Sequence, residues 1–555
     1  MRRRWEQDGL VLPPGQTAAR WRAQGWWRDR TLWDDFAQIA AERPNSIAVV
    51  SHGVSGHVET TSYRRLRVLA ERCAGGLVSL GVQPGEIVTV QLPNWWEFAL
   101  LSLACARVGA VVNPVVPIFR DREIGFILER SRSRVCVVPE SFRNFQHGEM
   151  MTRIMADLPD LEHVFTVRGT SQVAGTRSFE EFFLQRRWED EVDPAVLDAR
   201  TPEPDDVALL MFTSGTTGEP KGVLHTYNTL FAASRANAEV LGLGPDDPIL
   251  MMSTVGHGTG FFHGYVLPFS HGMPLVYQDV WDPAVMLDLI QDEGVVWTMA
   301  ATPFVVDAIA EQRRRPRDLS TFKYFSCAGT PIPPHLVREA REVLGAELIA
   351  IWGMTENGVP TITRPGDAIE IVSDSDGQPV PWFEIAVVDP EGRPMPGAQA
   401  GQLRVRGAGQ FAGYFRRRDL YDASVDAHGW FDTGDLARRR EDGGIRITGR
   451  SKDIIIRGGE NIPVLEVEAF LLQHPAVAEV ALVGYPDARL GERSCAVLVP
   501  NGEPPTLDEI QRHLASAGLV KQFWPERLEI VHELPKTAAG KIQKNRLRSR
   551  IQPAD

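Results

Sequence analysis

The segment Thr213–Gly222 has the residue types of a loop that binds phosphate groups. It reads TSGTTGEPKG, which combines three glycines, four hydroxyl side chains and a lysine. Glycines permit positive φ and close approach of the backbone, while N–H groups, hydroxyls and an ammonium replace water around phosphate oxygens. An apolar run at Val207–Phe212 precedes the segment and a helical pattern resumes near Thr226, so we expect strand, loop and helix in this order. A flexible polar hairpin is the alternative.

Two better-known glycine-rich nucleotide motifs do not describe this chain. A Walker A loop has Ser or Thr directly after a Gly-Lys pair, whereas here Pro220 precedes Lys221 and Gly222 follows it. The segment Gly407–Ala412 matches GxGxxA, but the residues after it show no amphipathic helix, so a dinucleotide site is disfavoured. The sequence therefore predicts phosphate binding by a different kind of loop.

TSGTTGEPKG resembles the signature loop of the adenylate-forming superfamily, which comprises acyl-CoA synthetases, aryl-acid ligases, luciferases and peptide-synthetase adenylation domains. Further matching segments follow in the family's order from Thr61 to Lys541, so the resemblance covers nearly the whole chain. It implies an α/β fold in which a large N-terminal multi-layer α/β domain, residues 1–450, is joined by a hinge to a small mobile α+β domain, residues 451–555. It also implies these ATP- and AMP-binding residues: Thr213, Ser214, Gly215, Thr216, Thr217, Gly218, Lys221, Gly329, Thr330, Pro331, Trp352, Gly353, Asp435 and Arg450.

The segment IWGMTE resembles the family motif usually written YGMTE. On that match Trp352 stacks on adenine, Thr355 touches the α-phosphate and Glu356 holds Mg²⁺. Tryptophan in place of the commoner tyrosine keeps the stacking face and loses the hydroxyl. A single carboxylate beside phosphate oxygens suits Mg²⁺, which is a hard cation with oxygen ligands.

The last matching segments are WFDTGD, GR, GGENI and PKTAAGK. By the resemblance, Asp435 accepts both ribose hydroxyls and Arg450 lies near the ribose, with a surface ion pair as the alternative. Lys452 takes the hinge position, and Gly459 lets pantetheine reach the adenylate, although an ordinary β-turn is nearly as good a reading. Lys541 would bridge the substrate carboxylate and the α-phosphate, because an ammonium offsets repulsion between two anions.

The segment from Ser253 to Phe261 resembles the family stretch that borders the acyl pocket. His257 matches its histidine or aromatic position, with a buried structural histidine as the alternative, and Gly329 lines the same pocket. Members that activate amino acids or hydroxybenzoates place Asp or Asn at the next position, where this chain has Gly258. An apolar acid is therefore favoured, although the leader Thr17–Trp26 resembles dihydroxybenzoate ligases as well as medium-chain and cyclohexanecarboxylate CoA ligases.

Together these residues predict activation of an apolar carboxylic acid by ATP and Mg²⁺, followed by transfer of the acyl group to coenzyme A. Lys541, Thr355, Glu356 and His257 form the expected catalytic group, and fatty-acid metabolism is the expected setting. Transfer to a separate acyl-carrier protein by an aryl-acid adenylating enzyme stays open. A nucleotide-binding protein without catalysis is the alternative from another class, which the intact charged residues disfavour.

The elements that must position these residues follow an α/β pattern. Short buried strands are expected at Ser46–Ser51 and Ile87–Gln91, and helices at Tyr63–Leu80 and Trp95–Val108. A boundary is expected near Lys452. The small domain is expected to contain helix Val464–Gln473, strands Val477–Gly484 and Ser494–Val499, helix Leu507–Ala517 and strand Leu528–Val531.

Composition excludes several other classes of protein. The 555 residues carry 72 acidic and 59 basic side chains, a net charge of −13 that argues against a nucleic-acid partner. Five scattered cysteines suggest neither a disulfide framework nor a zinc site. The most apolar stretch, Phe98–Val116, is interrupted by polar residues, so we expect no membrane span and a cytoplasmic location.

Overall fold

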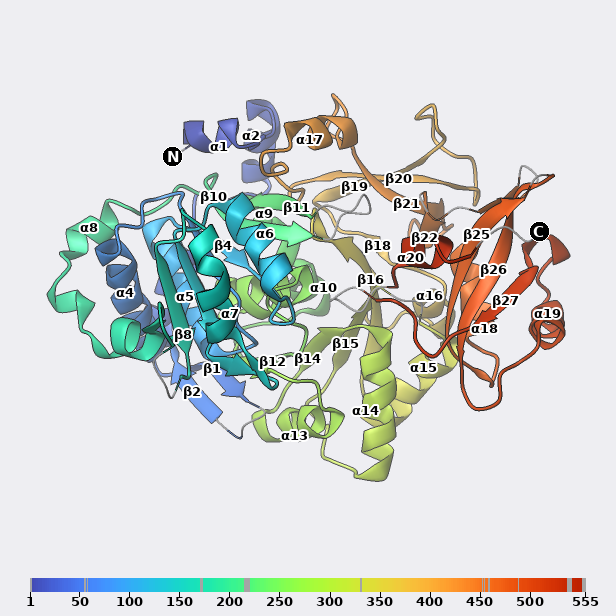
Figure 1. The fold of residues 1–555 in the computed structure, drawn as a ribbon, viewed down its shortest axis with the longest axis horizontal. Coiled ribbons are helices and arrows are strands. Elements are labelled where there is room, and N and C mark those ends of the chain that lie inside the picture. Colours follow the sequence, from blue (N-terminus) through green and yellow to red (C-terminus); the bar gives the residue numbers. More distant parts are fainter. Residues whose placement is uncertain are drawn as a thin grey trace. The chain divides into compact units, whose positions relative to one another are not determined.

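The computed structural model describes residues 2–53, 56, 58–169, 173–213, 220–329, 332–451, 453, 455–457, 460–487, 489–536 and 542–551. The chain forms two compact units (Figure 1). The large unit comprises Met1–Glu384 and Arg406–Gly429, and the small unit comprises Ile385–Val405 and Trp430–Asp555. The expected fold class, a large α/β part and a smaller α+β part, is confirmed. The predicted domain boundary between residues 450 and 451 remains a prediction.

A nine-stranded sheet forms one layer of the large unit. Its central strands, from β16 to β1, run parallel, and β17, β18 and β2 are antiparallel to their neighbours. In spatial order the strands are β18 (Gln378–Pro379), β17 (Gly358–Ile362), β16 (Glu347–Met354), β15 (Tyr324–Ala328), β14 (Trp297–Ala300), β12 (Ile249–Met251), β13 (Leu275–Gln278), β1 (Ile47–His52) and β2 (Val58–Ser62).

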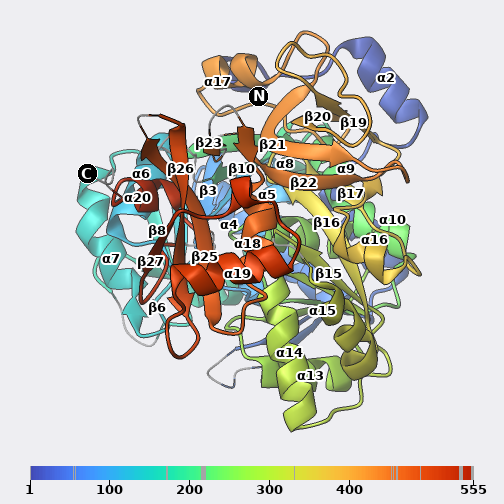
Figure 2. The same ribbon diagram turned by 90° about the vertical axis from the view of Figure 1, so that its right-hand side faces the viewer.

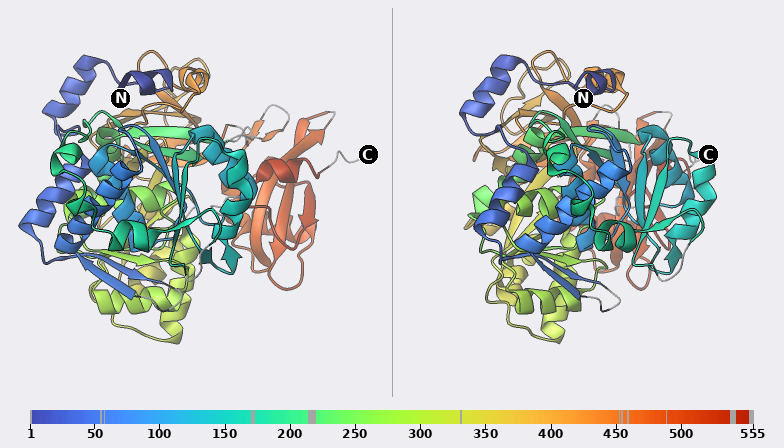
Figure 3. Two further views of the ribbon diagram at one scale, coloured as in Figure 1. Left: turned by 60° about the vertical axis from the view of Figure 1, so that its left-hand side comes forward. Right: turned by 90° about the vertical axis from the view of Figure 1, so that its left-hand side faces the viewer.

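A seven-stranded sheet forms a second layer. Figure 3 turns this part of the large unit toward the viewer, with most of its strands coloured blue to teal. Every pairing in it is parallel except that of β10 with β11. In spatial order the strands are β11 (Lys221–Thr226), β10 (Val207–Thr213), β4 (Val111–Pro114), β3 (Ile87–Val90), β5 (Val135–Pro139), β8 (His163–Val167) and β9 (Arg177–Ser178).

Helices cover these sheets. The expected helices are confirmed as α4 (Tyr63–Ser79) and α5 (Trp96–Val108), which pack on each other, and every residue of α5 is buried. The remaining α-helices of the large unit are α1 (Arg2–Gln7), α2 (Gly15–Ala23), α3 (Leu32–Glu42), α6 (Asp121–Ser131), α7 (His147–Ile154), α8 (Pro194–Asp198), α9 (Tyr227–Ser234), α10 (Ala236–Leu241), α11 (Gly258–Phe261), α12 (Leu267–His271), α13 (Pro283–Glu293), α14 (Thr302–Arg314), α15 (Pro334–Glu339), α16 (Ile369–Ser373) and α17 (Arg418–Ser424).

The glycine-rich loop joins two strands, so the expected order of strand, loop and helix was wrong. Thr213 at the end of β10 pairs with Lys221 at the start of β11, and α9 begins only after β11. The pairing adds an antiparallel edge strand to the sheet, which the short run of apolar residues after Gly222 did not reveal. Gly222 permits this close packing, because a Cβ there would lie 2.7 Å from the Leu210 side chain. Residues 214–219 are outside the described part.

In its described residues, the small unit contains two sheets and three α-helices, shown in Figure 2. One sheet has the order β19 (Phe383–Val388), β20 (Ala400–Gly407), β21 (Phe431–Arg439) and β22 (Ile445–Arg450). The other has the order β24 (Glu460–Ile462), β23 (Ile455–Arg457), β26 (Gly491–Pro500) and β25 (Val477–Asp487), with β27 (Arg527–Ile530) parallel to β26. Helices α18 (Val464–Leu471), α19 (Leu507–Ser516) and α20 (Lys544–Arg548) complete it. The strands and helices expected after residue 463 are thus confirmed.

Candidate active site

Part of the predicted site lies outside the described residues, and the roles of that part remain predictions. These residues are Ser214, Gly215, Thr216, Thr217, Gly218, Thr330, Pro331, Lys452, Gly459 and Lys541. The large unit holds Thr213, Lys221, His257, Gly258, Gly329, Trp352, Gly353, Thr355 and Glu356. The small unit holds Asp435 and Arg450.

A tight turn between β16 and β17 presents Thr355 and Glu356. Gly353 and Gly358 make the turn possible, because a Cβ on Gly353 would overlap the Gly358 carbonyl oxygen. Gly358 has φ of 65°, and a Cβ there would overlap a backbone carbonyl at the end of α9. The Asn357 side-chain oxygen accepts a hydrogen bond of 3.2 Å from the backbone N–H three residues earlier. The turn is therefore closely determined by backbone packing.

The Glu356 carboxylate is buried beside a tyrosine that the sequence did not single out. The Tyr414 hydroxyl donates to Glu356 Oε1 at 2.9 Å, and the Phe411 N–H donates to the Glu356 carbonyl at 2.6 Å. Lys221 Nζ lies 5.0 Å from the centre of the Tyr414 ring. Burial, and then the charge of Glu356, raise the pKa of Tyr414 far above its usual value, so the phenol keeps its proton. Tyr414 thus contacts a carboxylate through its hydroxyl and a cation through its ring.

The residues present fit a Mg²⁺–nucleotide site. Across the described ranges, no group of three or more His, Cys, Asp or Glu side chains could hold a metal ion. The buried Glu356 carboxylate offers one anionic oxygen ligand for such a cation. Mg²⁺ is commonly bound in this way, with one or two carboxylates and the phosphates of the substrate.

Gly258, predicted for the acyl pocket, lies next to Thr355, predicted for the α-phosphate. A Cβ at Gly258 would lie 3.2 Å from Thr355 Oγ1 and 3.6 Å from the ring of Phe262. His257 is half-buried and precedes α11, where its Nδ1 accepts a hydrogen bond of 3.3 Å from the backbone N–H of Thr259. The turn after β16 and the start of α11 therefore bring the two predicted groups together.

His225 fixes the same turn, although the sequence reasoning missed it. Its Nε2 donates to the Thr355 carbonyl at 2.8 Å, which leaves Nδ1 as an acceptor 3.0 Å from Thr229 Oγ1. The ring is fully buried, and this desolvation lowers its pKa to about 4. The sequence holds a signal for this role of His225, because residues 221, 223 and 225 lie on one face if their segment is a strand. Using that signal requires recognising that the segment forms the strand β11.

The other described residues of the large unit that are predicted to bind the nucleotide lie at or near the ends of strands. Thr213 Oγ1 donates to the Lys221 carbonyl at 3.4 Å and closes the base of the β10–β11 hairpin. Gly329 follows β15 with φ of 84°, a conformation that favours glycine. Trp352 is buried in β16. Stacking of adenine on Trp352 remains a prediction.

In the small unit, Asp435 and Arg450 form an ion pair. They are direct partners in the β21–β22 register, with Arg450 Nε 3.0 Å from Asp435 Oδ1. The Asp435 side chain is buried, and its backbone N–H donates to Thr433 Oγ1 at 3.1 Å. The sequence left a surface ion pair open as the alternative, but here the carboxylate is buried, and ribose binding by Asp435 remains a prediction.

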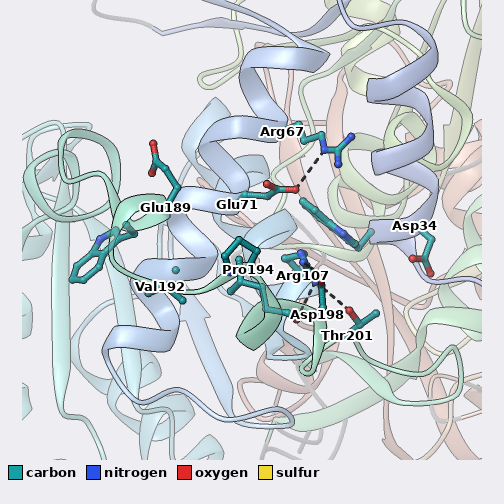
Figure 4. A pocket seen from close by; sticks show the side chains of 13 residues that line it. Asp34, Arg67, Glu71, Arg107, Glu189, Val192, Pro194, Asp198 and Thr201 are labelled. Carbon is teal, nitrogen blue, oxygen red and sulfur yellow. Dashed lines mark hydrogen bonds and ion pairs between the residues drawn. The ribbon is translucent and has the colours of Figure 1, made fainter.

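A separate cavity of about 380 Å³ lies elsewhere in the large unit, shown in Figure 4. Two ion pairs lie along it: Arg67 Nε lies 3.5 Å from Glu71 Oε1, and Arg107 pairs with Asp198 and donates to Thr201 Oγ1 at 3.1 Å. Its lining residues differ from those predicted to bind ATP or the acid.

In the described part of the chain, no helix is long and apolar enough to span a membrane.

Comparison with protein families identifies the class. The family model "AMP-binding enzyme" matches residues 36–415, which is more than half of the chain. The model "AMP-binding enzyme C-terminal domain" matches residues 466–541. The chain therefore belongs to the AMP-binding enzyme family, which confirms the resemblance to adenylate-forming enzymes.

Individual relatives cover nearly the full length. A medium-chain fatty-acid–CoA ligase from Escherichia coli (strain K12) is 34% identical over 97% of this chain and 93% of its own. A salicyl-AMP ligase/salicyl-S-ArCP synthetase from Mycobacterium tuberculosis (strain ATCC 25618 / H37Rv) is 32% identical, again over 97% and 93%. A crystal structure of the anthranilate CoA ligase AuaEII with anthranoyl-AMP superposes with a TM-score of 0.83 at 26% identity, covering 94% of this chain and 97% of that one.

Proposed function

We propose that this protein is an AMP-forming acid–thiol ligase. It converts an apolar carboxylic acid and ATP into an acyl-adenylate and pyrophosphate, and then transfers the acyl group to coenzyme A with release of AMP. The observation that carries the proposal is the meeting of Gly258, Thr355, Glu356 and Lys221 in the large unit. These residues, predicted separately for acid, α-phosphate, metal and phosphate binding, are linked through Thr355 and Tyr414. The names of the full-length relatives support the same reaction.

In the first step, a carboxylate oxygen of the acid attacks the α-phosphorus of ATP, and the bond to pyrophosphate breaks. Glu356 would hold Mg²⁺, which supplies charge neutralisation at the phosphate oxygens when bound. The Thr355 hydroxyl would donate to the α-phosphate, and Lys221 would contact the outer phosphates. Lys541 would lie between the two anions, where an ammonium stabilises the charge that develops.

In the second step, the sulfur of coenzyme A attacks the acyl carbon, and the bond to AMP breaks. The thiol gives up its proton and AMP leaves as the phosphate anion. We assign residues 1–450 to the AMP-binding domain and 451–555 to a mobile domain that turns about Lys452. This rotation of the mobile domain would withdraw Lys541 from the site and bring in the loop of Gly459, so that one hinge serves both half-reactions.

Gly258 favours an acid without a charged or hydrogen-bonding group near its carboxylate. The position faces the Thr355 hydroxyl and the Phe262 ring, and it offers no side chain to pair an amino group or a phenol. Medium-chain, alicyclic and aromatic acids fit this description, which agrees with a role in fatty-acid metabolism. The acid is therefore defined by class.

The direct test is exchange of labelled pyrophosphate into ATP with a panel of such acids, followed by thioester formation with coenzyme A. Exchange that depends on an apolar acid, together with an acyl-CoA product, is expected. The variant Lys541→Ala should lose most exchange yet form thioester from a supplied adenylate. Lys521→Ala, which removes an exposed lysine elsewhere in the small unit, is the matched control and should keep both steps. A complete lack of exchange would contradict the enzyme proposal.

A second candidate is an aryl-acid adenylating enzyme that loads a separate carrier protein. The M. tuberculosis relative supports it, since its identity and coverage are close to those of the CoA ligase. Exchange with hydroxybenzoates but not with apolar acids, and no thioester with coenzyme A, would favour this candidate.

We also assign the protein to the cytoplasm. All five cysteines are buried free thiols, which supports a reducing compartment. Cell fractionation would test this assignment.

A further inference from the structure

Tyr414 contacts both charged side chains that the proposed reaction requires in the large unit. Its hydroxyl donates to Glu356 Oε1 at 2.9 Å, and its ring centre lies 5.0 Å from Lys221 Nζ. The tyrosine is 3% exposed and Glu356 is 8% exposed, so this contact lies in the interior. A hydrogen bond to a buried carboxylate fixes its orientation, and such charge-assisted bonds are stronger than neutral ones.

The segment that carries Tyr414 is held against β11 by backbone hydrogen bonds. The N–H groups of Ala412 and Phe415 donate to Leu224 and Gly222 at 2.7 Å, and the Leu224 N–H donates to Gly413 at 2.9 Å. Val223 and Tyr414 form the corresponding antiparallel bridge. The position of Tyr414 is therefore set in register with the strand that begins at Lys221.

The N-terminal residues hold the other edge of this segment. The Val11 N–H donates to the Ala412 carbonyl at 2.7 Å, and the Arg416 N–H donates to the Asp8 carbonyl at 2.6 Å. Arg416 Nε also pairs with Asp8 Oδ1 at 2.8 Å. Gly9 has φ of 109°, and a Cβ there would overlap the Tyr414 carbonyl oxygen. The backbones approach too closely for any larger residue.

Apolar packing fixes the N-terminal residues in turn. The Trp5 ring lies 5.8 Å from the Phe415 ring, and both join a buried cluster with residues of β3, β4, β10 and β11. Figure 1 and Figure 2 show the N-terminus and α17, which follows this segment, in the same region of the large unit. Residues 5–11, the segment around Tyr414, β11 and β10 thus form four neighbouring backbone segments.

We infer that Tyr414 is a positioning residue for Glu356, and that residues 5–11 hold Tyr414 in place for binding of Mg²⁺–ATP. The inference rests on the proposed function. A phenol is suited to this task because it fixes one carboxylate oxygen without adding a positive charge, so the carboxylate keeps its full charge for a cation. An arginine or lysine at this distance would compete with the metal for that charge.

The test compares ATP binding with and without metal by isothermal titration calorimetry of the full-length protein. Tyr414→Phe removes only the hydroxyl and should weaken binding of ATP in excess Mg²⁺ by about tenfold. Binding of ATP in EDTA should stay within about twofold, because the contact acts through the metal-binding carboxylate. The matched control is Tyr421→Phe, whose ring packs on Phe411 at 5.3 Å, and it should bind as the parent does in both buffers.

Gly9→Ala tests the N-terminal part from outside the site. It should also weaken binding in Mg²⁺ more than binding in EDTA, since it displaces the Tyr414 backbone. Equal losses in both buffers would mean a merely structural role and would overturn the inference, as would parental affinity in Tyr414→Phe. Parental affinity in Gly9→Ala would overturn the role of residues 5–11. If the parent protein itself bound no ATP, the proposed function would fail. If the parent activated acids normally and Tyr414→Phe bound Mg²⁺–ATP as tightly as the parent, only the inference about Tyr414 would be rejected.

Discussion

Replacing His225 with glutamine should make the protein less sensitive to acid. Burial lowers the pKa of His225 from 6.5 to about 4 in the folded protein. Below pH 6.5 the unfolded chain binds a proton at this residue that the folded protein does not bind until near pH 4. The stabilisation from the neutral ring is therefore complete above pH 6.5 and is lost as the pH falls.

The two pKa values set the size of the effect. Between pH 8 and pH 5, proton uptake by the unfolded chain at this one residue lowers the free energy of unfolding by about 2 kcal/mol. Glutamine cannot titrate, and its amide can still donate toward the Thr355 carbonyl. His225→Gln should be about 1–2 kcal/mol less stable than the parent at pH 8, because it loses the contact with Thr229 and ring packing. That difference should vanish or reverse at pH 5.

Urea denaturation at pH 8 and pH 5 measures the difference, with tryptophan fluorescence as the signal. Twelve of the fourteen tryptophans belong to the large unit, which contains His225. His428→Gln, at an exposed position, is the matched control and should follow the parent at both pH values. A stability difference between His225→Gln and the parent that stays constant within about 0.5 kcal/mol from pH 8 to pH 5 would refute the reasoning.

Three further substitutions test the fold and the site. Gly358→Ala should cost about 3 kcal/mol of stability in urea denaturation, because it combines a left-handed φ with a backbone overlap. Arg168→Ala should cost about 3–5 kcal/mol in the same assay, since it leaves the buried Glu97, now 2.8 Å from Arg168 Nε, without its charge partner. Asp435→Ala should weaken ATP binding about tenfold in calorimetry, if the carboxylate accepts the ribose hydroxyls.

Each of these predictions has a control. Gly366 has φ of 80° but open space around a Cβ, so Gly366→Ala should cost only about 1 kcal/mol, and equal losses would exclude the overlap as the cause. Adding Glu97→Gln to Arg168→Ala should restore part of the stability, and no recovery would contradict the charge argument. Asp442→Ala removes another ion pair in the β21–β22 hairpin and should leave ATP affinity unchanged; the same loss in both aspartate variants would argue against a specific role for Asp435.

Local sequence patterns located much of the fold. The apolar spacing of α4 and α5, and the helices and strands after residue 463, were predicted within a few residues. Such elements follow from the periodicity of side chains along one segment. The edge strand β11 was missed, because six residues between a glycine-rich loop and a helix carry too short a pattern to reveal an antiparallel pairing.

The sequence by itself determined the class of chemistry. TSGTTGEPKG and the segments around Glu356 and Asp435 carry the family's residue types in order, and the family match confirms that class. Only the tertiary structure decided which side chains support them. Tyr414 meets Glu356 across 58 residues of sequence, and Asp8 meets Arg416 across 408. Contacts of this kind arise when distant backbone segments pair and bury their side chains, so no spacing along the chain encodes them.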